Sequence, residues 1–316
     1  MAVTIGIDVG GTKIAAGVVD DAGKVIARRQ IATAAMHPTA VVAGIVKVAQ
    51  ELNAAAPGTT GIGIGAAGLI DGANGVVLSA PNIAWENVPL RQMVADRIDL
   101  PVVIDNDANV AAWGEALYGA GKGYGDQIML TVGTGIGGGI IIGGQIYRGA
   151  HGVGAELGHM IVDASGPSEC PCGNHGCLEA MASGNSIGRR ARERASEPGA
   201  AAVLERAGRD GAAITGELVG EAAKAGDVWA RAIVTETGRW LGVGIANVVN
   251  IFDPSAVIIA GGAAAGTGEL LLGPARDAAA ELIIGHAWRK LPPVLPAALG
   301  YDAGLVGAAA LARAIR

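Results

Sequence analysis

Aromatic residues are scarce in this sequence, whose 316 positions hold five Trp, four Tyr and one Phe. The hydrophobic content of 51% therefore comes mainly from Ala, Val, Ile and Leu. The 52 glycines allow backbone segments to approach one another closely. This composition favours close-packed α/β layers. The length exceeds the usual size of one domain, so we expect two domains, or one domain with a large insertion.

Positive charge is also limited, since 23 Lys and Arg stand against 29 Asp and Glu, for a net charge of −6. A nucleic-acid surface needs clustered basic residues, so we expect no nucleic-acid partner. The basic cluster at 189–194 is interpreted as a solvated helix face. No apolar run is free enough of glycine and polar residues to span a membrane, and the first residues lack a leader pattern. We therefore predict a cytoplasmic protein with no membrane partner.

Cysteine is rare, and all its copies lie within eight residues: Cys170, Cys172 and Cys177. Random placement would produce such a cluster on the order of once in five hundred trials. The count is odd, the first two cysteines are too close for an unstrained disulfide, and two glycines in the segment permit tight turns. A purely packing role of the thiols would explain neither the Cys-x-Cys spacing nor the glycines. The pattern indicates a metal site, and a structural zinc ion needs a fourth ligand, for which His159 and His175 are candidates.

Secondary structure is expected to alternate between strands and helices. Apolar runs predict strands at 3–7, 14–20, 24–31, 61–65, 101–105, 127–132, 140–143 and 256–260. Helical spacing of apolar residues predicts helices at 38–53, 89–98, 107–118, within 217–250 and at 304–315. The order of strand, glycine-rich tip and returning strand occurs at 3–20 and again at 127–143. This repeat predicts a duplicated α/β domain with a cleft between the copies.

The two glycine-rich tips, 8–13 and 133–139, expose backbone N–H groups that can hold a chain of phosphates. Thr12 and Thr134 add hydroxyl donors, and Lys13 adds positive charge. Neither tip fits a Walker A loop or a dinucleotide-binding fingerprint. Each tip alone is equally compatible with a structural turn, but the duplication favours a nucleotide site.

Asp107 follows a predicted strand and opens a predicted helix. An Asp in this position commonly caps the helix N-terminus. The functional alternative is a general base that accepts the proton of a substrate hydroxyl during phosphoryl transfer.

Taken together, these motifs resemble the ROK sugar kinases, which belong to the larger actin-like ATPase group, over essentially the whole chain. The most specific motif is Cys170-x-Cys172-Gly173-x-x-Gly176-Cys177-x-Glu179, preceded by Glu156-x-x-His159. Two segments resemble the phosphate loops of the family, Asp8-x-Gly10-Gly11-Thr12-Lys13 and Gly133-Thr134-Gly135-x-Gly137-Gly138-Gly139. Ala260-Gly261-Gly262 resembles its adenosine segment, and Asn106-Asp107-x-Asn109 resembles its catalytic segment.

The resemblance implies an α/β fold of two actin-like (ribonuclease H-like) domains that flank a catalytic cleft. The smaller domain would comprise residues 1–118 and 303–316. The larger domain would comprise 119–302 and carry a zinc knuckle at 159–179. The family also implies ATP, Mg²⁺ and a structural Zn²⁺ as cofactors, and a homodimer or homotetramer.

The resemblance further implies residue roles. Asp107 would deprotonate the sugar 6-hydroxyl, and Asp8 would help to hold Mg²⁺ through water. The zinc ligands would be Cys170, Cys172, Cys177 and His159, so the family selects His159 over His175. The sugar would contact Gly68, Asn82, Asn106, Asp107, Glu156, His159 and Glu179. The nucleotide would contact Asp8, Gly10, Gly11, Thr12, Lys13, Gly133, Thr134, Gly135, Gly261 and Gly262.

The sugar is suggested by segments 65–68 and 80–85, which resemble bacterial, particularly actinobacterial, glucokinases more than N-acetylmannosamine kinases. The expected reaction is transfer of the ATP γ-phosphoryl group to the 6-hydroxyl of glucose. Mannose, N-acetylmannosamine and fructose are alternative sugars, because one or two hydrogen bonds discriminate between such hexoses. Polyphosphate is an alternative donor. A sugar-sensing regulator is the rival from another class, but it would carry a helix-turn-helix before the first strand, which is predicted here from residue 3.

Overall fold

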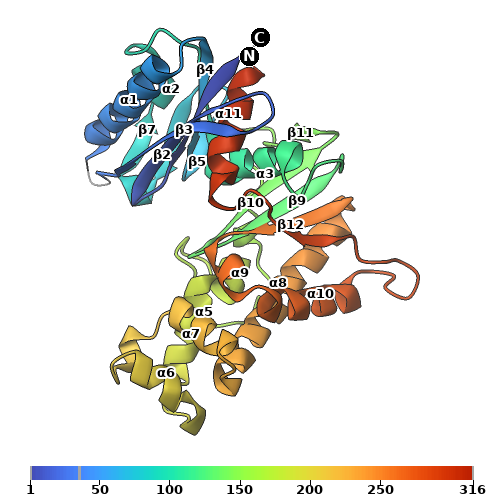
Figure 1. The fold of residues 1–316 in the computed structure, drawn as a ribbon. Coiled ribbons are helices and arrows are strands. Elements are labelled where there is room, and N and C mark those ends of the chain that lie inside the picture. The colour runs from blue at the N-terminus through green and yellow to red at the C-terminus, as the bar shows by residue number, and fades with distance from the viewer. Residues whose placement is uncertain (1, 35–36, 315–316) are drawn as a thin grey trace. The chain divides into compact units, whose positions relative to one another are not determined.

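The computed structural model describes residues 2–34 and 37–314, so the predicted helix end at 315 and domain end at 316 lie outside the described residues. The chain forms two compact units (Figure 1). Unit 1 comprises residues 1–127, 139–155 and 297–316, and unit 2 comprises 128–138 and 156–296. The predicted domain limits at 118 and 303 stay a prediction. No described helix combines the length and the apolar character that crossing a membrane requires.

Unit 1 is built on a five-stranded sheet with the order β3-β2-β1-β4-β8. Strand β1 pairs antiparallel with β2 and parallel with β4, and β4 pairs parallel with β8. The strands are β1 (Val3–Val9), β2 (Lys13–Val19), β3 (Val25–Ala32), β4 (Thr59–Ala66) and β8 (Val102–Asn106). A small antiparallel sheet that the sequence reasoning missed contains β5 (Leu69–Asp71), β6 (Val76–Ala80) and β7 (Trp85–Val88).

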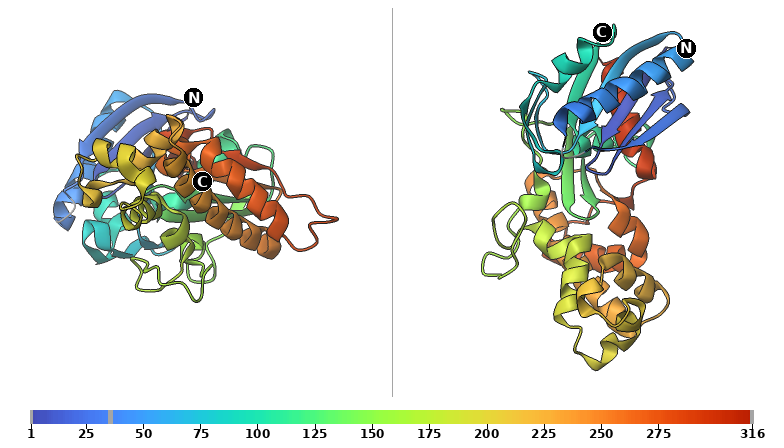
Figure 2. Two further views of the ribbon diagram at one scale, coloured as in Figure 1. Left: turned by 90° about the horizontal axis from the view of Figure 1, so that it is seen from below. Right: turned by 90° about the vertical axis from the view of Figure 1, so that its left-hand side faces the viewer.

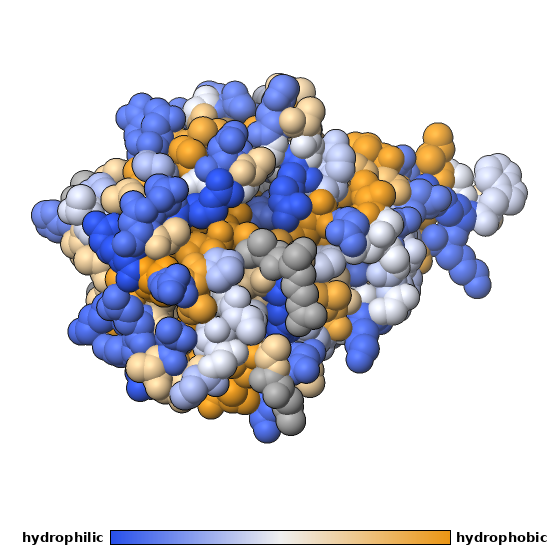
Figure 3. Space-filling model, turned by 90° about the horizontal axis from the view of Figure 1, so that it is seen from above, coloured by the Kyte–Doolittle hydropathy of each residue, from blue (hydrophilic) through white to orange (hydrophobic). Residues whose placement is uncertain are grey.

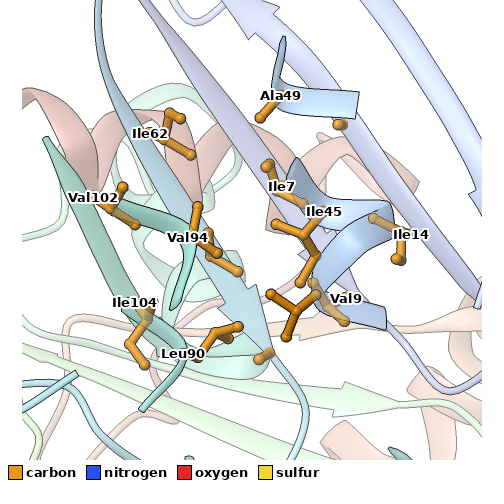
Figure 4. Close-up of a cluster of buried hydrophobic side chains, with 14 of the residues drawn as sticks. Ile7, Val9, Ile14, Ile45, Ala49, Ile62, Leu90, Val94, Val102 and Ile104 are labelled. Carbon is orange, nitrogen blue, oxygen red and sulfur yellow. The ribbon is translucent and has the colours of Figure 1, made fainter. Parts of the chain in front are cut away.

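Helices cover both faces of the five-stranded sheet in unit 1 (Figure 2). They are α1 (Pro38–Ala55), α2 (Leu90–Ala95), α3 (Asp107–Tyr118) and α11 (Ala303–Arg313), with the short 3-10 helices η1 (Pro81–Ile83) and η5 (Gly300–Asp302). Alternation along β1 directs Ile7 and Val9 into a fully buried core with Ile45 of α1 (Figure 4). Ile62 of β4 and Ile104 of β8 belong to the same core.

The opposite face of the sheet meets α11 through glycine. A Cβ added at Gly6 of β1 would lie 1.9 Å from the Leu305 carbonyl oxygen, and one added at Gly63 of β4 would lie 1.8 Å from that of Ala308. On the same face, Thr4 donates a hydrogen bond from Oγ1 to the carbonyl oxygen of Ala309, at 2.8 Å. The helix therefore packs directly on the backbone of the central strands, where no larger residue fits.

The second five-stranded sheet has the order β11-β10-β9-β12-β13. Its strands are β9 (Gln127–Val132), β10 (Ile136–Ile142), β11 (Gln145–Ile146), β12 (Ala256–Ala260) and β13 (Val294–Pro296). The strands predicted at 127–132 and 256–260 are confirmed. The prediction that the glycine tip extends to 139 was wrong, because glycines 137–139 already belong to β10. The turn is thus confined to 133–135.

Unit 2 contains the helices from η2 to α10. They are α4 (Leu178–Ala182), α5 (Gly184–Glu193), α6 (Ala201–Arg206), α7 (Gly216–Lys224), α8 (Val228–Phe252), α9 (Gly262–Thr267) and α10 (Glu269–Leu282), with the 3-10 helices η2 (Leu157–His159), η3 (Pro198–Ala200) and η4 (Gly211–Ala213). Helix α8 packs closely on α10, since a Cβ at Gly242 would lie 2.6 Å from the Ala275 carbonyl oxygen.

The interpretation of 189–194 as a solvated face was wrong for Arg190, which is only 3% exposed. Its guanidinium donates to Oε1 of Glu236 at 3.0 Å and to the carbonyl oxygen of Met181 at 2.7 Å. A buried cation needs such partners, and Glu236 lies too far along the chain for local sequence reasoning to identify it.

Candidate active site and metal centre

The first set of predicted site residues lies at the carboxyl edge of the unit 1 sheet. The parallel registers place Asp8 of β1 beside Gly65 of β4, and Gly65 beside Asp105 of β8. Gly65 also faces the start of α3, since a Cβ there would lie 3.6 Å from Cα of Asp107. The carboxyl ends of parallel strands are the usual location of ligand sites in such sheets.

Asn106 is the N-cap of α3. Its Oδ1 accepts hydrogen bonds from the backbone N–H groups of Ala108 at 2.9 Å and Asn109 at 3.1 Å. Its Nδ2 donates to the carbonyl oxygen of Gly68 at 3.0 Å, which fixes the loop after β4. The alternative interpretation of Asp107 as the N-cap was therefore wrong, because the neighbouring asparagine caps the helix and Asp107 is its first residue.

Asp105 and Arg148 form a support for this segment that sequence reasoning missed. Asp105 is 2% exposed, and its Oδ2 accepts from both Nε and Nη2 of Arg148 at 2.6 Å. Its Oδ1 accepts from the Asn106 backbone N–H at 2.8 Å and from Nδ2 of Asn109 at 3.0 Å. The buried carboxylate thus holds the start of α3 in place. The acidic motif was visible in the sequence, but its partner lies 43 residues away.

Asp107 and Asp8 both have raised pKa values. Burial raises the pKa of Asp107 above its ordinary 3.8, although hydrogen bonds from the backbone of Ala108 and of Asp107 itself oppose the change. Burial also raises the pKa of Asp8 to about 6, the charge of Asp107 adds to this increase, and Lys13 opposes it. Perturbed carboxyl groups gathered at one edge are typical of catalytic sites.

The first glycine turn connects β1 with β2. The backbone N–H of Gly10 donates to the carbonyl oxygen of Lys13 at 3.0 Å, which closes the turn. Asn82 in η1 lies next to it, because a Cβ at Gly11 would be 3.5 Å from Cβ of Asn82. The Lys13 ammonium lies 5.3 Å from the ring centroid of Tyr301, a cation–π contact. The structure thus gathers Asp8, the glycine turn, Asn82 and the start of α3 in unit 1.

The second set of predicted residues lies in unit 2 around the cysteine knuckle, residues 159–179. Cys170 donates its backbone N–H to the carbonyl oxygen of Asn174 at 2.8 Å, which closes a turn containing Gly173 at φ +91°. An isolated antiparallel bridge pairs Ile161 with Cys177. This bridge returns the last cysteine to the segment that follows His159.

Four ligand atoms, from His159, Cys170, Cys172 and Cys177, lie within 4.8 Å of one another. A zinc ion bound tetrahedrally at about 2.3 Å from sulfur and about 2.05 Å from nitrogen separates two sulfurs by about 3.8 Å, and sulfur from nitrogen by about 3.6 Å. The Sγ atoms of Cys172 and Cys177 are 3.8 Å apart. Sγ of Cys170 is 3.6 Å from Nδ1 of His159. The cluster is therefore compatible with zinc.

The chemistry of the donors also favours a cation. Burial, together with the neighbouring thiols of Cys172 and Cys177, raises the pKa of Cys170 to about 12. Burial and Cys172 likewise raise the pKa of Cys177. A bound divalent cation reverses this penalty, because it stabilises thiolates directly. His175 lies apart from the four, with its Nε2 3.8 Å from Oε1 of the exposed Glu169.

Glu179 links the knuckle to the second glycine turn. Its Oε2 accepts the backbone N–H of Ile136 at 2.8 Å, and its Oε1 lies 3.7 Å from Sγ of Cys170. A Cβ at Gly135 would lie 2.3 Å from the same Oε2, so glycine allows the carboxylate to approach. Within unit 2 the turn and the metal cluster thus lie on two sides of one carboxylate.

Two further predicted segments lie in unit 2. Gly261 has φ +97°, and a Cβ there would lie 2.3 Å from the carbonyl oxygen of Val132, so the turn after β12 packs against the end of β9. Glu156 is exposed and precedes η2, where its carbonyl oxygen accepts the backbone N–H of His159 at 3.0 Å.

Comparison with known proteins identifies one family over nearly the whole chain. The model of the ROK family matches residues 4–315. The chain is 44% identical to the glucokinase of Streptomyces coelicolor, over 99% of this chain and 98% of that protein. It is 39% identical to a xylose repressor of Caldicellulosiruptor bescii, over 70% of this chain and 54% of the repressor.

The fold is similar to a crystal structure of a ROK family glucokinase from Streptomyces griseus in complex with glucose and AMPPNP. The TM-score is 0.88 and the identity 45%, over 99% of this chain and 100% of that one. The predicted fold class, α/β of the two-domain actin-like type, is confirmed. The motif-based resemblance is confirmed as well, and the chain belongs to the ROK family.

Proposed function

We propose that the protein is a glucokinase that transfers the ATP γ-phosphoryl group to the 6-hydroxyl of glucose, giving glucose 6-phosphate and ADP. The observation that carries this proposal is Asp107, a carboxylate with a raised pKa at the first position of α3. Asn106 caps this helix, and the ion pair of Asp105 with Arg148 holds the segment before it. The whole-length likeness to two Streptomyces glucokinases supports the same reaction.

In this mechanism the sugar 6-hydroxyl donates a hydrogen bond to the Asp107 carboxylate. The proton moves to Asp107 as the sugar oxygen attacks the γ-phosphorus, and the bond to the β–γ bridging oxygen breaks. A base with a raised pKa suits this role, since it accepts a proton more readily than a fully solvated carboxylate. Gly65 lets β4 pass directly against this helix start, and Asp105 keeps it from shifting.

The sugar contacts proposed in unit 1 are Gly68, Asn82 and Asn106, and those in unit 2 are Glu156, His159 and Glu179. The Oδ1 of Asn106 caps α3 and one N–H of its amide holds Gly68, so its second N–H is the group offered to a sugar hydroxyl. Carboxylates such as Glu156 and Glu179 accept hydrogen bonds from hydroxyl groups.

The nucleotide is proposed to contact the glycine turns. The backbone N–H groups of 10–13 and 133–135 would hold phosphates, and the turn at Gly261 and Gly262 would hold the adenosine. Mg²⁺ bound to the phosphates would neutralise their charge, and Asp8 would hold it through water. We further propose that the two actin-like domains divide near residues 118 and 303.

The metal of the knuckle is proposed to be Zn²⁺, held by His159, Cys170, Cys172 and Cys177, which fit it in distance and donor type. It would supply rigidity rather than activate water. With Nδ1 of His159 facing the cluster, Nε2 is left for the sugar and the ring orientation is fixed.

A sugar-sensing regulator is the rival function, because the family includes repressors. The xylose repressor is matched over 54% of its length, whereas the two glucokinases are matched over 98% and 100%. The whole-length likeness therefore supports the kinase.

A panel of glucose, mannose, N-acetylmannosamine and fructose, each with ATP and with polyphosphate, tests the function. We expect glucose with ATP to give the highest kcat/KM in a coupled assay, with mannose at least about tenfold lower, because one misplaced hydroxyl loses hydrogen bonds. Faster turnover of N-acetylmannosamine or fructose would assign another sugar. DNA binding at physiological salt without ADP formation would instead favour the regulator.

Replacing Asp107 by Asn tests the general base. The Asp107→Asn variant keeps the size and an acceptor for the Ala108 N–H, so we expect glucose affinity by calorimetry to change less than about threefold. Its kcat should fall by about 10²–10⁴-fold, because the variant cannot accept the proton. Asp99→Asn, an exposed carboxylate of the same unit, is the matched control. A kcat for Asp107→Asn within tenfold of the parent would rule out its role as base.

The raised pKa of Asp8 predicts a pH-dependent cost to stability. Between 3.8 and about 6 the folded state binds more protons at Asp8 than the unfolded state, so stability falls as pH rises through this range. The free energy of unfolding of Asp8→Asn at pH 7.5 should therefore exceed that of the parent by on the order of 3 kcal/mol. The difference should vanish below about pH 4. Urea unfolding without added Mg²⁺ measures it, with Asp99→Asn as control. An Asp8→Asn gain that is independent of pH would contradict the assignment.

Metal binding is tested with Cys172→Ser. We expect zinc, measured by elemental analysis, to drop from one per chain to a small fraction of that. The KM for glucose should rise by about tenfold or more, because His159 loses its orientation. His175→Asn is the matched control, since this histidine lies outside the cluster. Full zinc content in Cys172→Ser would refute the proposed ligand set.

A further inference from the structure

Glu115 of α3 is a buried acidic residue that has no part in the proposed chemistry. Figure 3 shows many hydrophilic side chains at the surface, where charged residues normally lie, whereas Glu115 is 0% exposed. Burial of a carboxylate costs free energy unless hydrogen bonds replace its lost hydration. The groups that bind this carboxylate therefore indicate its role.

The Glu115 carboxylate accepts hydrogen bonds from backbone N–H groups of two separate segments. Its Oε2 accepts from Ala120 at 2.8 Å and from Ala298 at 3.0 Å. Its Oε1 accepts from Leu299 at 2.7 Å. An ionised carboxylate only accepts hydrogen bonds, and its charge makes them stronger than bonds between neutral groups. One side chain thus fastens both segments to α3.

These two segments belong to the first and the last connection between the units. The chain enters unit 2 after residue 127 and returns from it for the last time at residue 297. Ala120 lies in the connection from α3 to β9, whereas Ala298 and Leu299 lie in the connection from β13 to η5. Glu115 therefore holds both connections to one helix of unit 1.

The first connection is fixed at both of its ends. A Cβ at Gly119 would lie 2.0 Å from Oε2 of Glu115, so glycine leaves the room that the carboxylate needs. Nε2 of Gln127, the first residue of β9, donates to the carbonyl oxygens of Gly121 and Tyr124, both at 3.1 Å. Glu115 thus holds the α3 end of this connection, and Gln127 holds the β9 end.

Helix α3 is itself fixed, because it packs backbone to backbone on α11. A Cβ at Gly114 would lie 2.6 Å from the carbonyl oxygen of Ala303 at the start of α11. Asp107 begins α3, about 12 Å along the helix axis from Glu115. The proposed base and the two connections are therefore joined through one firmly packed helix.

We propose that Glu115 is a positioning residue of phosphoryl transfer, which ties α3 and its base to the first and last connections with unit 2. The inference rests on the proposed function, in which Asp107 belongs to unit 1 and the second glycine turn, 133–135, belongs to unit 2. The base and the phosphate reach an in-line arrangement only when the connections hold α3 in one place. Glu115 acts through Asp107 and contacts neither substrate.

Hydrogen exchange, measured by mass spectrometry, tests the contacts without relying on catalysis. The methyl group of Gly119→Ala displaces the Glu115 carboxylate, so amide exchange at Ala298 and Leu299, far away in the chain, should become about tenfold faster or more. Gly125→Ala is the matched control in the same connection, because a Cβ there meets nothing within 4 Å. Unchanged exchange at 298–299 in Gly119→Ala would overturn the proposal.

Steady-state kinetics test the positioning role. Glu115→Gln keeps the side chain's size but turns an NH₂ group toward at least one N–H donor. In Glu115→Gln and in Gly119→Ala, kcat at saturating glucose and ATP should fall by about tenfold or more, because small displacements of reacting groups slow transfer strongly. The double variant should lie within about threefold of the slower single variant, since both changes act on one carboxylate.

The exposed Glu86→Gln is the matched control for the charge, and with Gly125→Ala it should keep kcat within about twofold of the parent. Circular dichroism and urea unfolding confirm that each variant is folded under the assay conditions. A lower unfolding free energy with unchanged kcat would make Glu115 a structural support only and overturn the proposal. A parent that does not phosphorylate glucose would refute the proposed function itself, and exchange at 298–299 would still show whether Glu115 holds both connections.

Discussion

Close backbone contact is the constraint on which the structure depends. With ten aromatic residues in 316, the interior cannot be filled by large rings, so helices and strands approach one another at glycine. Gly63 brings β4 onto α11, and Gly242 brings α8 onto α10. At these positions a single methyl group would meet a carbonyl oxygen far inside van der Waals contact. The packing therefore tolerates no volume increase where helices meet the sheet or each other.

The same constraint shapes the two candidate sites. Gly65 allows β4 to lie against the start of α3, where Asp107 is the first residue, and Gly135 allows the Glu179 carboxylate to reach the second glycine turn. Close packing also excludes water, which raises the pKa values of Asp8 and Asp107. The two buried carboxyl groups thus stand where their ionisation reduces stability, as is common at active sites.

Hydrogen bonding fixes the side chains around these groups. Asn106 caps α3 and holds Gly68, while Asp105 ties the same segment to Arg148. In unit 2 the carboxylate of Glu179 lies between Cys170 and the turn that ends at Gly135. Each cluster is connected to a neighbouring loop, so a change in one side chain alters the position of others.

Local sequence pattern was sufficient to predict several helices and strands of this protein and its metal motif. The bounds of α3, β9 and β12 follow from apolar spacing and from the residues that end each element. The cysteine spacing alone indicated a metal site, because three thiols on glycine turns have few other uses. These features depend on interactions between residues a few positions apart, so a short stretch of sequence is enough to predict them.

Contacts between residues far apart in the chain could not be predicted from local sequence pattern. Two contacts depend on segments far apart in the chain: the pairing of Asp105 with Arg148 and the burial of Arg190 against Glu236. The amino-acid order thus determines many of the elements, the metal motif and the family. Burial and charge pairing arise only when the folded chain brings remote groups into one low-dielectric environment.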